Sequence, residues 1–370
     1  MHTLRHPADR VQIDRAEVSA YTVPTDAPES DGTLQWDKTT LVLVHLEAGK
    51  WRGLGYTYAN HATADLIQDS LFPEILHRDA LDIPLLWRRM VDRIRNLGRP
   101  GISSMAISAV DIALWDLKSR ILDVPLVSLL GAARDAVPVY GSGGFCSYNA
   151  QQLEDQFIAW MEKGIRLFKM KVGRDVHADI HRVRHAYEVI GPSNELMVDA
   201  NGAYSRKLAL LQAERFADQR VCWFEEPVSS DDLEGLRLLR DRAPAGMAIA
   251  AGEYGYDAYY FRRMIEAGAV DVLQADATRC GGVTGFIQAA NLCAGWGIPL
   301  SSHTAPAIHM HLGCACDDVR HLEYFHDHER IERMFFAGNV EVVNGALRPD
   351  LARPGLGLEF KLADAKRFAA

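Results

Sequence analysis

The sequence predicts an α/β fold in which a (β/α)8 barrel of the TIM type follows an N-terminal α+β capping domain. From about residue 136, short apolar or β-branched segments alternate with segments whose apolar residues recur at helical spacing. The first 135 residues lack this alternation. A regular alternation of strands and helices is typical of a parallel sheet, and eight repeats of it suit a closed barrel.

Eight barrel strands are predicted from these apolar segments. They cover residues 137–143, 166–172, 195–201, 221–227, 248–254, 270–276, 298–304 and 320–325. Helices are predicted between them, for example over 153–164, 208–219 and 261–268, where the apolar residues follow a period of about 3.6.

The capping domain is expected to contain antiparallel strands and helices. Residues 11–23 and 38–48 read as two strands separated by a polar loop at 24–37. A helix over 107–122 has a broad apolar face. Its members are Ile107, Val110, Ile112, Ala113, Leu114 and Leu117. We expect a capping domain over 1–135, a barrel over 136–329, and a segment over 330–370 that packs back onto the capping domain.

Composition and charge limit the possible functions. A formal charge of −9 without a basic run argues against binding to nucleic acid. No signal peptide and no membrane-spanning segment is recognised. The six cysteines are scattered without zinc-like spacing, which suits a reduced, cytoplasmic protein. A homo-oligomer is the default expectation.

Ionisable residues recur at the carboxyl ends of the predicted strands, where barrels of this type place their active sites. The residues are Lys169, Lys171, Asp199, Glu225, Glu253, Asp276, His303 and Glu323. From Lys171 onward they are 20 to 28 positions apart, about one strand and helix each. Any one of them alone would be an ordinary surface residue. Their shared place at the strand ends indicates an active site.

Three carboxylates from consecutive strands, Asp199, Glu225 and Glu253, are expected to converge on one point. Like charges so placed require a cation, and hard oxygen ligands without cysteine or histidine favour Mg²⁺. Glu226 follows Glu225 and should face the opposite way by strand alternation. We therefore expect Glu226 to serve in the helix layer.

The stretch LFKMKVG places Lys169 and Lys171 on one face of a strand, since side chains alternate. Taken alone, Lys-x-Lys is typical of an exposed strand. Beside a metal site, one lysine can hold a substrate carboxylate. We expect burial and neighbouring charge to lower the pKa of the other until it can act as a base.

His303 is expected to pair with Asp276 on the adjacent strand. A carboxylate that accepts a hydrogen bond from one imidazole nitrogen leaves the other nitrogen free for proton transfer. His309 and His311 lie beyond the strand end, and we assign them no role.

Over essentially its full length the sequence resembles the enolase superfamily, specifically the mandelate racemase subgroup. The resemblance rests on FKMKVG, MVDANG, WFEEPV, AAGEYG, QADATRCGGVTG, LSSHTA and HLEYF, and on ALWDL in the capping helix. It implies Mg²⁺ on the three carboxylates and catalytic roles for the other rim residues.

In particular, the resemblance implies that Lys169 contacts the substrate carboxylate and that Lys171 is one base. The His303–Asp276 pair would be the base or acid on the other face. Glu323 would hydrogen-bond the substrate carboxylate, with most effect if it is held protonated, and Asn201 would contact a substrate hydroxyl. The loop near residues 22–38 would shape specificity at the barrel mouth.

This chemistry removes a proton next to a carboxylate and passes through an enediolate intermediate. Loss of a β-hydroxyl would then give a 2-keto-3-deoxy acid, whereas reprotonation on the other face would give racemisation or epimerisation. The polar capping loop favours the dehydration of a sugar acid. A 2-hydroxy-acid racemase or epimerase is the alternative, and a catalytically silent binding protein is a remote one. GSGGFC (141–146) breaks the dinucleotide-binding glycine spacing, which argues against a dehydrogenase.

Overall fold

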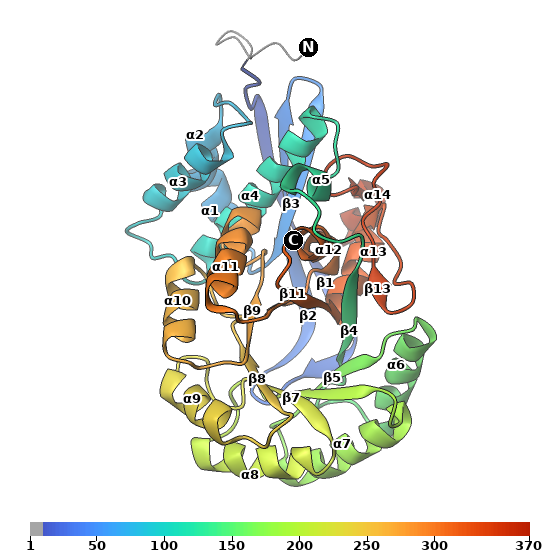
Figure 1. Cartoon of the computed structure of the whole chain (residues 1–370). Helices are drawn as coiled ribbons and strands as arrows, with labels where there is room; N and C mark the ends of the chain where they lie inside the picture. The colour runs from blue at the N-terminus through green and yellow to red at the C-terminus, as the bar shows by residue number, and fades with distance from the viewer. Residues whose placement is uncertain (1–9) are drawn as a thin grey trace.

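The computed structural model describes residues 10–370 and contains a closed barrel of eight parallel strands (Figure 1). The strands are β4 (Val137–Gly143), β5 (Leu167–Lys171), β6 (Glu195–Asp199), β7 (Val221–Glu225), β8 (Ala248–Ala251), β9 (Val272–Ala275), β10 (Leu300–Ser302) and β11 (Val319–Phe325). Each pairs in parallel with the next, and β11 pairs with β4 to close the barrel. The predicted fold class is therefore confirmed, and each predicted strand overlaps an observed one.

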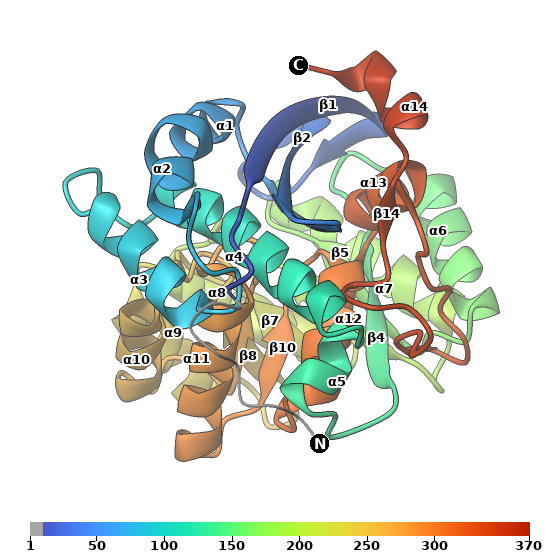
Figure 2. The ribbon, with the colours of Figure 1, turned by 90° about the horizontal axis from the view of Figure 1, so that it is seen from above.

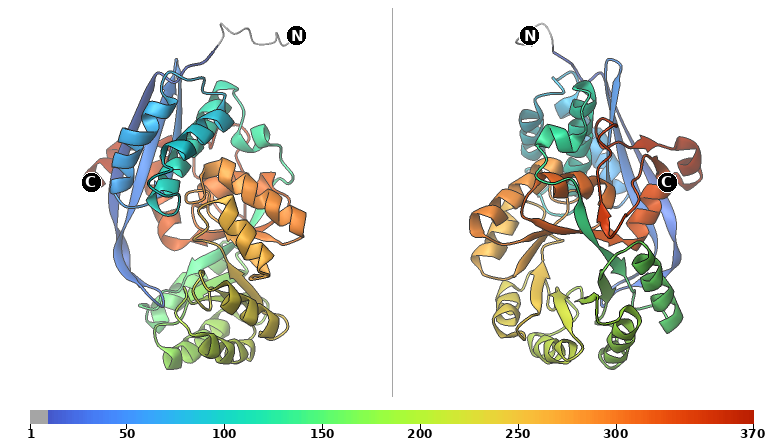
Figure 3. Two further views of the ribbon diagram at one scale, coloured as in Figure 1. Left: turned by 90° about the vertical axis from the view of Figure 1, so that its left-hand side faces the viewer. Right: turned by 45° about the vertical axis from the view of Figure 1, so that its right-hand side comes forward.

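Helices surround the barrel on the outside (Figures 1 and 3). They are α6 (Ala150–Glu162), α7 (Val176–Ile190), α8 (Arg206–Ala217), α9 (Leu233–Arg242), α10 (Ala258–Glu266), α11 (Gly282–Trp296), α12 (Pro306–Ala315) and α13 (His326–Phe335). Several start at a side chain that accepts a hydrogen bond from the first turn, as Asn149 and Asp257 do. Such caps fix where the strand-to-helix connections end.

The capping domain is a three-stranded antiparallel sheet with helices packed on one side (Figure 2). Its strands are β1 (Arg15–Ser30), β2 (Gln35–Ala48) and β3 (Trp51–Tyr58). Its helices are α1 (Ala62–Leu66), the π-helix η1 (Ile67–Leu71), α2 (Phe72–Ile75), α3 (Ile83–Arg93), α4 (Ile102–Ile121) and α5 (Leu126–Leu130).

Strand β3 was absent from the sequence expectations, because its glycines are disfavoured in strands. The structure gives a reason for one of them. A Cβ at Gly55 would lie 2.3 Å from the carbonyl oxygen of Ala109 and from the nitrogen of Ala113. Glycine therefore allows β3 to lie directly against helix α4.

The polar loop expected at 24–37 is wrong in extent, since β1 continues to Ser30 and β2 begins at Gln35. β1 is an edge strand whose register shifts between Pro24 and Glu29, and such a position tolerates proline and polar side chains. The tight turn is shorter, and Asp31 Oδ1 accepts hydrogen bonds from the backbone of Thr33 and Leu34.

The tip of this hairpin reaches the barrel, as the long strands in Figure 3 show. A Cβ at Gly32 would lie 2.7 Å from the carbonyl oxygens of Val172 and Ala200. These two residues directly follow β5 and β6. The tip therefore covers the ends of the strands that carry the lysine pair and Asp199.

The C-terminal segment runs between the barrel and the capping sheet. It contains β12 (Phe336–Ala337), β13 (Ala346–Leu347), β14 (Glu359–Phe360), α14 (Leu362–Ala365) and the 3₁₀ turn η2 (Lys366–Phe368). The ring of Phe360 lies 5.4 Å from that of Tyr21, and Glu359 pairs with Arg120 of α4 at 2.9 Å. The domain boundaries at 135/136 and 329/330 stay a prediction.

The barrel wall and the capping domain each have a buried apolar core. All six cysteines are free. Within residues 10–370, the helices lack the combination of length and hydrophobicity needed to cross a bilayer.

Candidate active site

The rim residues predicted from sequence lie together at the carboxyl ends of the barrel strands, and each is less than a tenth exposed. They are Lys169, Lys171, Asp199, Glu225, Glu253, Asp276, His303 and Glu323. Burying so many charged groups is costly unless they pair with one another or with a ligand. Their catalytic roles remain predictions.

The carboxylates of Asp199, Glu225 and Glu253 each offer an oxygen within 4.8 Å of the others. Asp199 and Glu225 end β6 and β7, and Glu253 lies two residues beyond β8. Glu253 Oε2 is buried, and His303 Nε2 lies 3.2 Å from it. The oxygens of three buried carboxylates converge here and form a donor set that fits Mg²⁺.

The two lysines share one face of β5, as strand alternation predicts, and each is held by cluster carboxylates. Lys169 Nζ lies 2.7 Å from oxygens of Glu225 and of Glu323. Lys171 Nζ lies 2.5 Å from Asp199 Oδ2.

The expectation of a lowered pKa at Lys171 is wrong for this arrangement. Burial lowers the pKa of Lys171, but the charges of Asp199, Glu253 and Glu225 together raise it above the ordinary value. Sequence alone does not show how closely Asp199 approaches the ammonium group.

His303, directly after β10, and Asp276, directly after β9, form the expected pair, with 2.8 Å between Nδ1 and Oδ2. His303 Nε2 points the other way and lies 3.2 Å from Glu253 Oε2. Burial lowers the pKa of His303, but the charge of Glu253 and the hydrogen bonds to Asp276 and Glu253 raise it to about 9. The imidazole therefore lies between the carboxylate cluster and the buried carboxylate of Asp276.

His309 and His311 have structural partners, which accords with assigning them no role. His309 accepts a hydrogen bond from the backbone of Ala277 on Nε2 and lies 2.8 Å from the oxygen of Thr304 on Nδ1. His311 Nε2 lies 3.2 Å from the oxygen of Leu356.

Glu323, on β11, is fixed by three neighbours on β4, on β5 and in the turn after β10. Its carboxylate accepts hydrogen bonds from Ser142 Oγ at 2.6 Å and from the backbone of Thr304 at 2.8 Å, and it pairs with Lys169. Burial raises the pKa of Glu323, but the charges of Lys169, His303 and Lys171 together lower it below its usual range. The expected protonated form is therefore not the one this arrangement favours.

Two further expectations concern the residues just after strands. Glu226 was expected in the helix layer, but its backbone leaves the strand with φ +36°, so alternation no longer applies. Burial, and then the charges of Glu253 and Asp199, raise its pKa, so its carboxyl is within electrostatic reach of the cluster. Asn201 is half-buried, and its Oδ1 has no hydrogen-bond partner, so the predicted contact with a substrate hydroxyl stays open as a prediction.

Sequence reasoning missed Arg279, which lies within the QADATRCGGVTG stretch. Its guanidinium lies 3.6 Å from Glu253 and 3.6 Å from Asp276, so it adds positive charge between the cluster and the His303 pair. Arg279 follows the strand-end residue Asp276 by three positions, and this spacing could have indicated that Arg279 lies near the rim.

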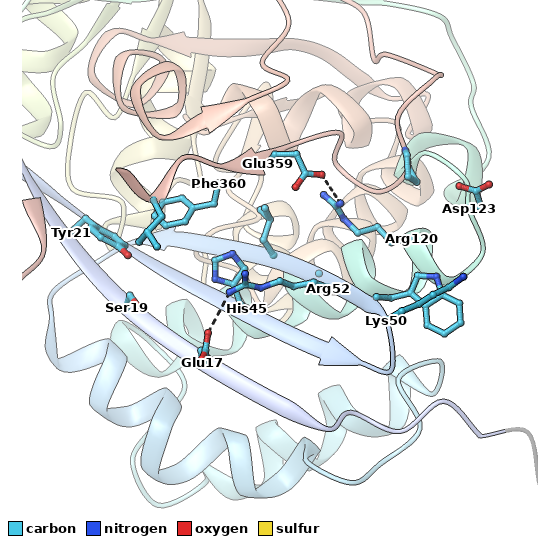
Figure 4. Close-up of a pocket in the computed structure, with 15 residues that line it drawn as sticks. Glu17, Ser19, Tyr21, His45, Lys50, Arg52, Arg120, Asp123, Glu359 and Phe360 are labelled. Carbon is cyan, nitrogen blue, oxygen red and sulfur yellow. Dashed lines mark hydrogen bonds and ion pairs between the residues drawn. The ribbon is translucent and has the colours of Figure 1, made fainter. Parts of the chain in front are cut away.

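A hollow of about 560 Å³ lies on the capping domain, beside the C-terminal segment (Figure 4). Four of its charged groups pair with each other, Glu17 with Arg52 and Arg120 with Glu359. None of the predicted catalytic residues lines it. We therefore assign the chemistry to the barrel rim.

Comparison with protein families matches two models. Residues 16–131 match the mandelate racemase / muconate lactonizing enzyme N-terminal domain, and residues 152–365 match the enolase C-terminal domain-like family.

Two curated relatives are similar over most of the chain. A 3,6-anhydro-alpha-L-galactonate cycloisomerase of Streptomyces coelicolor is 33% identical over 94% of this chain and 98% of its own. An L-talarate/galactarate dehydratase of Salmonella typhimurium is 32% identical over 85% of this chain and 81% of its own.

Solved structures agree closely with the fold. A mandelate racemase/muconate lactonizing enzyme-like protein of Rubrobacter xylanophilus is 54% identical, with a TM-score of 0.95 over 97% of this chain and 100% of its own. A racemase of Streptomyces coelicolor with bound magnesium is 32% identical, with a TM-score of 0.91 over 97% and 100%. An L-talarate dehydratase of Polaromonas sp. JS666 with Mg and L-glucarate is 31% identical, with a TM-score of 0.88 over 97% and 97%.

A capped (β/α)8 barrel with three carboxylates on successive strands, a lysine pair and a histidine–aspartate pair defines an enzyme of the enolase superfamily. Within it, the chain belongs to the mandelate racemase / muconate lactonizing enzyme family. The magnesium in the related structures supports Mg²⁺ as the cofactor, and Asp199, Glu225 and Glu253 can bind it.

Proposed function

We propose that the enzyme removes the proton next to the carboxylate of a sugar acid and then eliminates the β-hydroxyl, forming a 2-keto-3-deoxy acid. The observation that carries this proposal is the placement of two proton-transfer groups around one carboxylate cluster. Lys171 lies on β5 and His303 follows β10, so at least two other strands separate them on either path around the barrel. A substrate between them would present one face to each group.

In this proposal Lys169 binds the substrate carboxylate, because its ammonium group is buried beside the cluster and next to Glu323. When bound, Mg²⁺ supplies positive charge beside that carboxylate. Lys171 takes the proton from carbon 2 as the free amine, which gives an enediolate; a cation held by Asp199 would offset the charge that raises the pKa of Lys171. Asp276 holds His303 so that Nε2 faces the substrate, and His303 gives a proton to the leaving hydroxyl.

The polar face of the capping hairpin favours dehydration of a hydroxylated substrate. Glu29 and Ser30, near the hairpin tip, are buried, and Glu29 Oε1 has no hydrogen-bond partner. An aryl substrate would want an apolar lid instead. The curated dehydratase relative acts on L-talarate and galactarate by its name, which supports a sugar acid here.

The same two proton-transfer groups also suit the alternative of racemisation or epimerisation, in which Lys171 keeps the abstracted proton and His303 donates its own proton to the other face of carbon 2. For either reaction we also propose a small carboxylate substrate, a cytoplasmic location and a homo-oligomer. Light scattering after size-exclusion chromatography tests the assembly.

The test is a screen of mono- and diacid sugars with Mg²⁺, in which 2-keto acid is detected as its semicarbazone. Exchange of the α-proton is followed in D₂O at the same time. Keto acid formation is expected. Exchange with inversion and no keto acid would replace dehydration by the alternative. Neither signal with any hydroxy acid, together with no Mg²⁺ binding by calorimetry, would instead indicate a silent binding protein.

A further inference from the structure

His328, on helix α13 beyond the last barrel strand, has a side chain that the site as described leaves without a function. It is 8% exposed, and its Nδ1 is buried without a hydrogen-bond partner. A buried polar group left unpaired costs roughly 1–3 kcal/mol, so such a group calls for a partner.

The ring of His328 is held in one orientation by aromatic neighbours from both domains. It stacks on Tyr58 of β3 with 3.4 Å between ring centroids and 14° between planes. Phe325 meets it edge-on at 5.1 Å. The Tyr58 hydroxyl also donates to the carbonyl oxygen of His328, at 3.3 Å. The imidazole is therefore pre-positioned between the cap and the barrel rim.

Helix α13 begins directly after β11, the strand that contains Glu323, so His328 lies five residues beyond a rim residue. Burial lowers the pKa of His328, and the charge of His303 lowers it further, against a smaller opposite effect of Asp276. A neutral imidazole has one donor and one acceptor nitrogen, which suits a hydroxyl better than a carboxylate.

We propose that His328 is a substrate-binding residue that hydrogen-bonds a hydroxyl of the sugar acid at carbon 4 or beyond, with Tyr58 fixing the plane of its ring. This rests on the proposed function, because it assigns the part of the substrate away from the carboxylate. In this proposal, Lys169 and the carboxylate cluster with its cation bind the carboxylate end of the substrate. His328 then determines which hydroxylated chains the site accepts.

The test compares the sugar acid found in the screen with analogues lacking one hydroxyl at carbon 4 or beyond. In the wild type, loss of the bound hydroxyl is expected to lower kcat/KM by about 10- to 100-fold. His328→Phe keeps the ring for stacking and should show a similar loss with the parent substrate. With the matching deoxy analogue, the variant and the wild type should be nearly equal.

His328→Gln, which retains a donor and an acceptor, should recover part of the activity with the parent substrate. His181→Phe, the same change at an exposed histidine of α7, is the control and should leave both substrates unaffected. Thermal unfolding checks that each variant is folded.

Equal losses with the parent and with every deoxy analogue would show a structural role only and would overturn the inference. The proposed function would still stand, because wild-type keto acid formation tests it separately. A wild type without keto acid or α-proton exchange overturns both.

Discussion

The Nδ1 atom of His303 lies 2.8 Å from Oδ2 of Asp276, which fixes the imidazole by a buried carboxylate on the adjacent strand. The other ring nitrogen is thereby directed at the carboxylate cluster. Three variants test whether this pair transfers protons.

His303→Asn should abolish turnover while the fold is retained, because no other group takes its place after β10. Asp276→Asn should lower kcat by about 10²–10⁴-fold, since it removes the group that fixes the tautomer. Steady-state kinetics and circular dichroism give the readouts. His181→Asn, on an exposed face of α7, is the control, and near-normal activity of His303→Asn would remove it from the mechanism.

Lys171→Ala should abolish both turnover and α-proton exchange. Lys171→Arg should be inactive as well, because a guanidinium keeps the charge but does not act as a base. The control is Lys207→Ala, a change at an exposed lysine of α8. Measured exchange in D₂O at the wild-type rate for Lys171→Arg would contradict the assignment of Lys171 as the base.

Mg²⁺ should bind once per chain and stabilise the protein, by about 2.7 kcal/mol when its concentration is 100 times Kd. Glu225→Gln and Glu253→Gln should each weaken this binding strongly in calorimetry and reduce the shift in Tm that EDTA reverses. Asp26 belongs to a second acidic group with Glu29 and His326. If Asp26→Asn removes the Mg²⁺ effect and the other two variants do not, the metal site has been misplaced.

Glu29→Gln should stabilise the protein more at pH 8 than at pH 5. Burial, and then the charge of Asp327, raise the pKa of Glu29 to about 9, so the folded state favours the neutral carboxyl. Its contribution to stability is full below the unfolded pKa near 4.5 and is lost as the pH rises through 9. Glutamine stays neutral throughout, so the expected gain at pH 8 is about 1 kcal/mol or more by urea unfolding. A gain independent of pH would show that Glu29 is ionised in the folded protein.

Gly55→Ala should destabilise the protein by roughly 1–3 kcal/mol, because its Cβ would push α4 away from β3. Gly295→Ala is the matched control, since no atom lies within 4 Å of its Cβ, and in helix α11 it should stabilise by up to about 1 kcal/mol. Thermal unfolding compares the two. Equal Tm values for both variants would show that α4 can shift away from β3 without a loss of stability, which would contradict this prediction.

The barrel could be predicted because its strands are buried, so continuous apolar runs mark them and their ends mark the rim. Asp199, Glu225 and Asp276 were found in this way. Strand alternation predicts the direction of a side chain only within the strand. Glu226 turns toward the cluster because its backbone adopts a positive φ, which no alternation pattern contains.

Other features depend on contacts between distant segments. The edge strand β1 contains Pro24 and polar residues that read as a loop, and β3 is recognisable only beside α4. The raised pKa of Lys171 follows from its approach to Asp199. His328 is one of three histidines near the end of β11, and only its buried, unpaired nitrogen distinguishes it.

The hydrogen bond between Ser142 and Glu323 joins the first and last strands of the barrel, which pair only when the ring is complete. Glu323 also holds Lys169. An incompletely folded chain with a gap between these strands therefore lacks a fully assembled catalytic centre. For this enzyme, the onset of turnover during refolding should coincide with ring closure and not with earlier collapse.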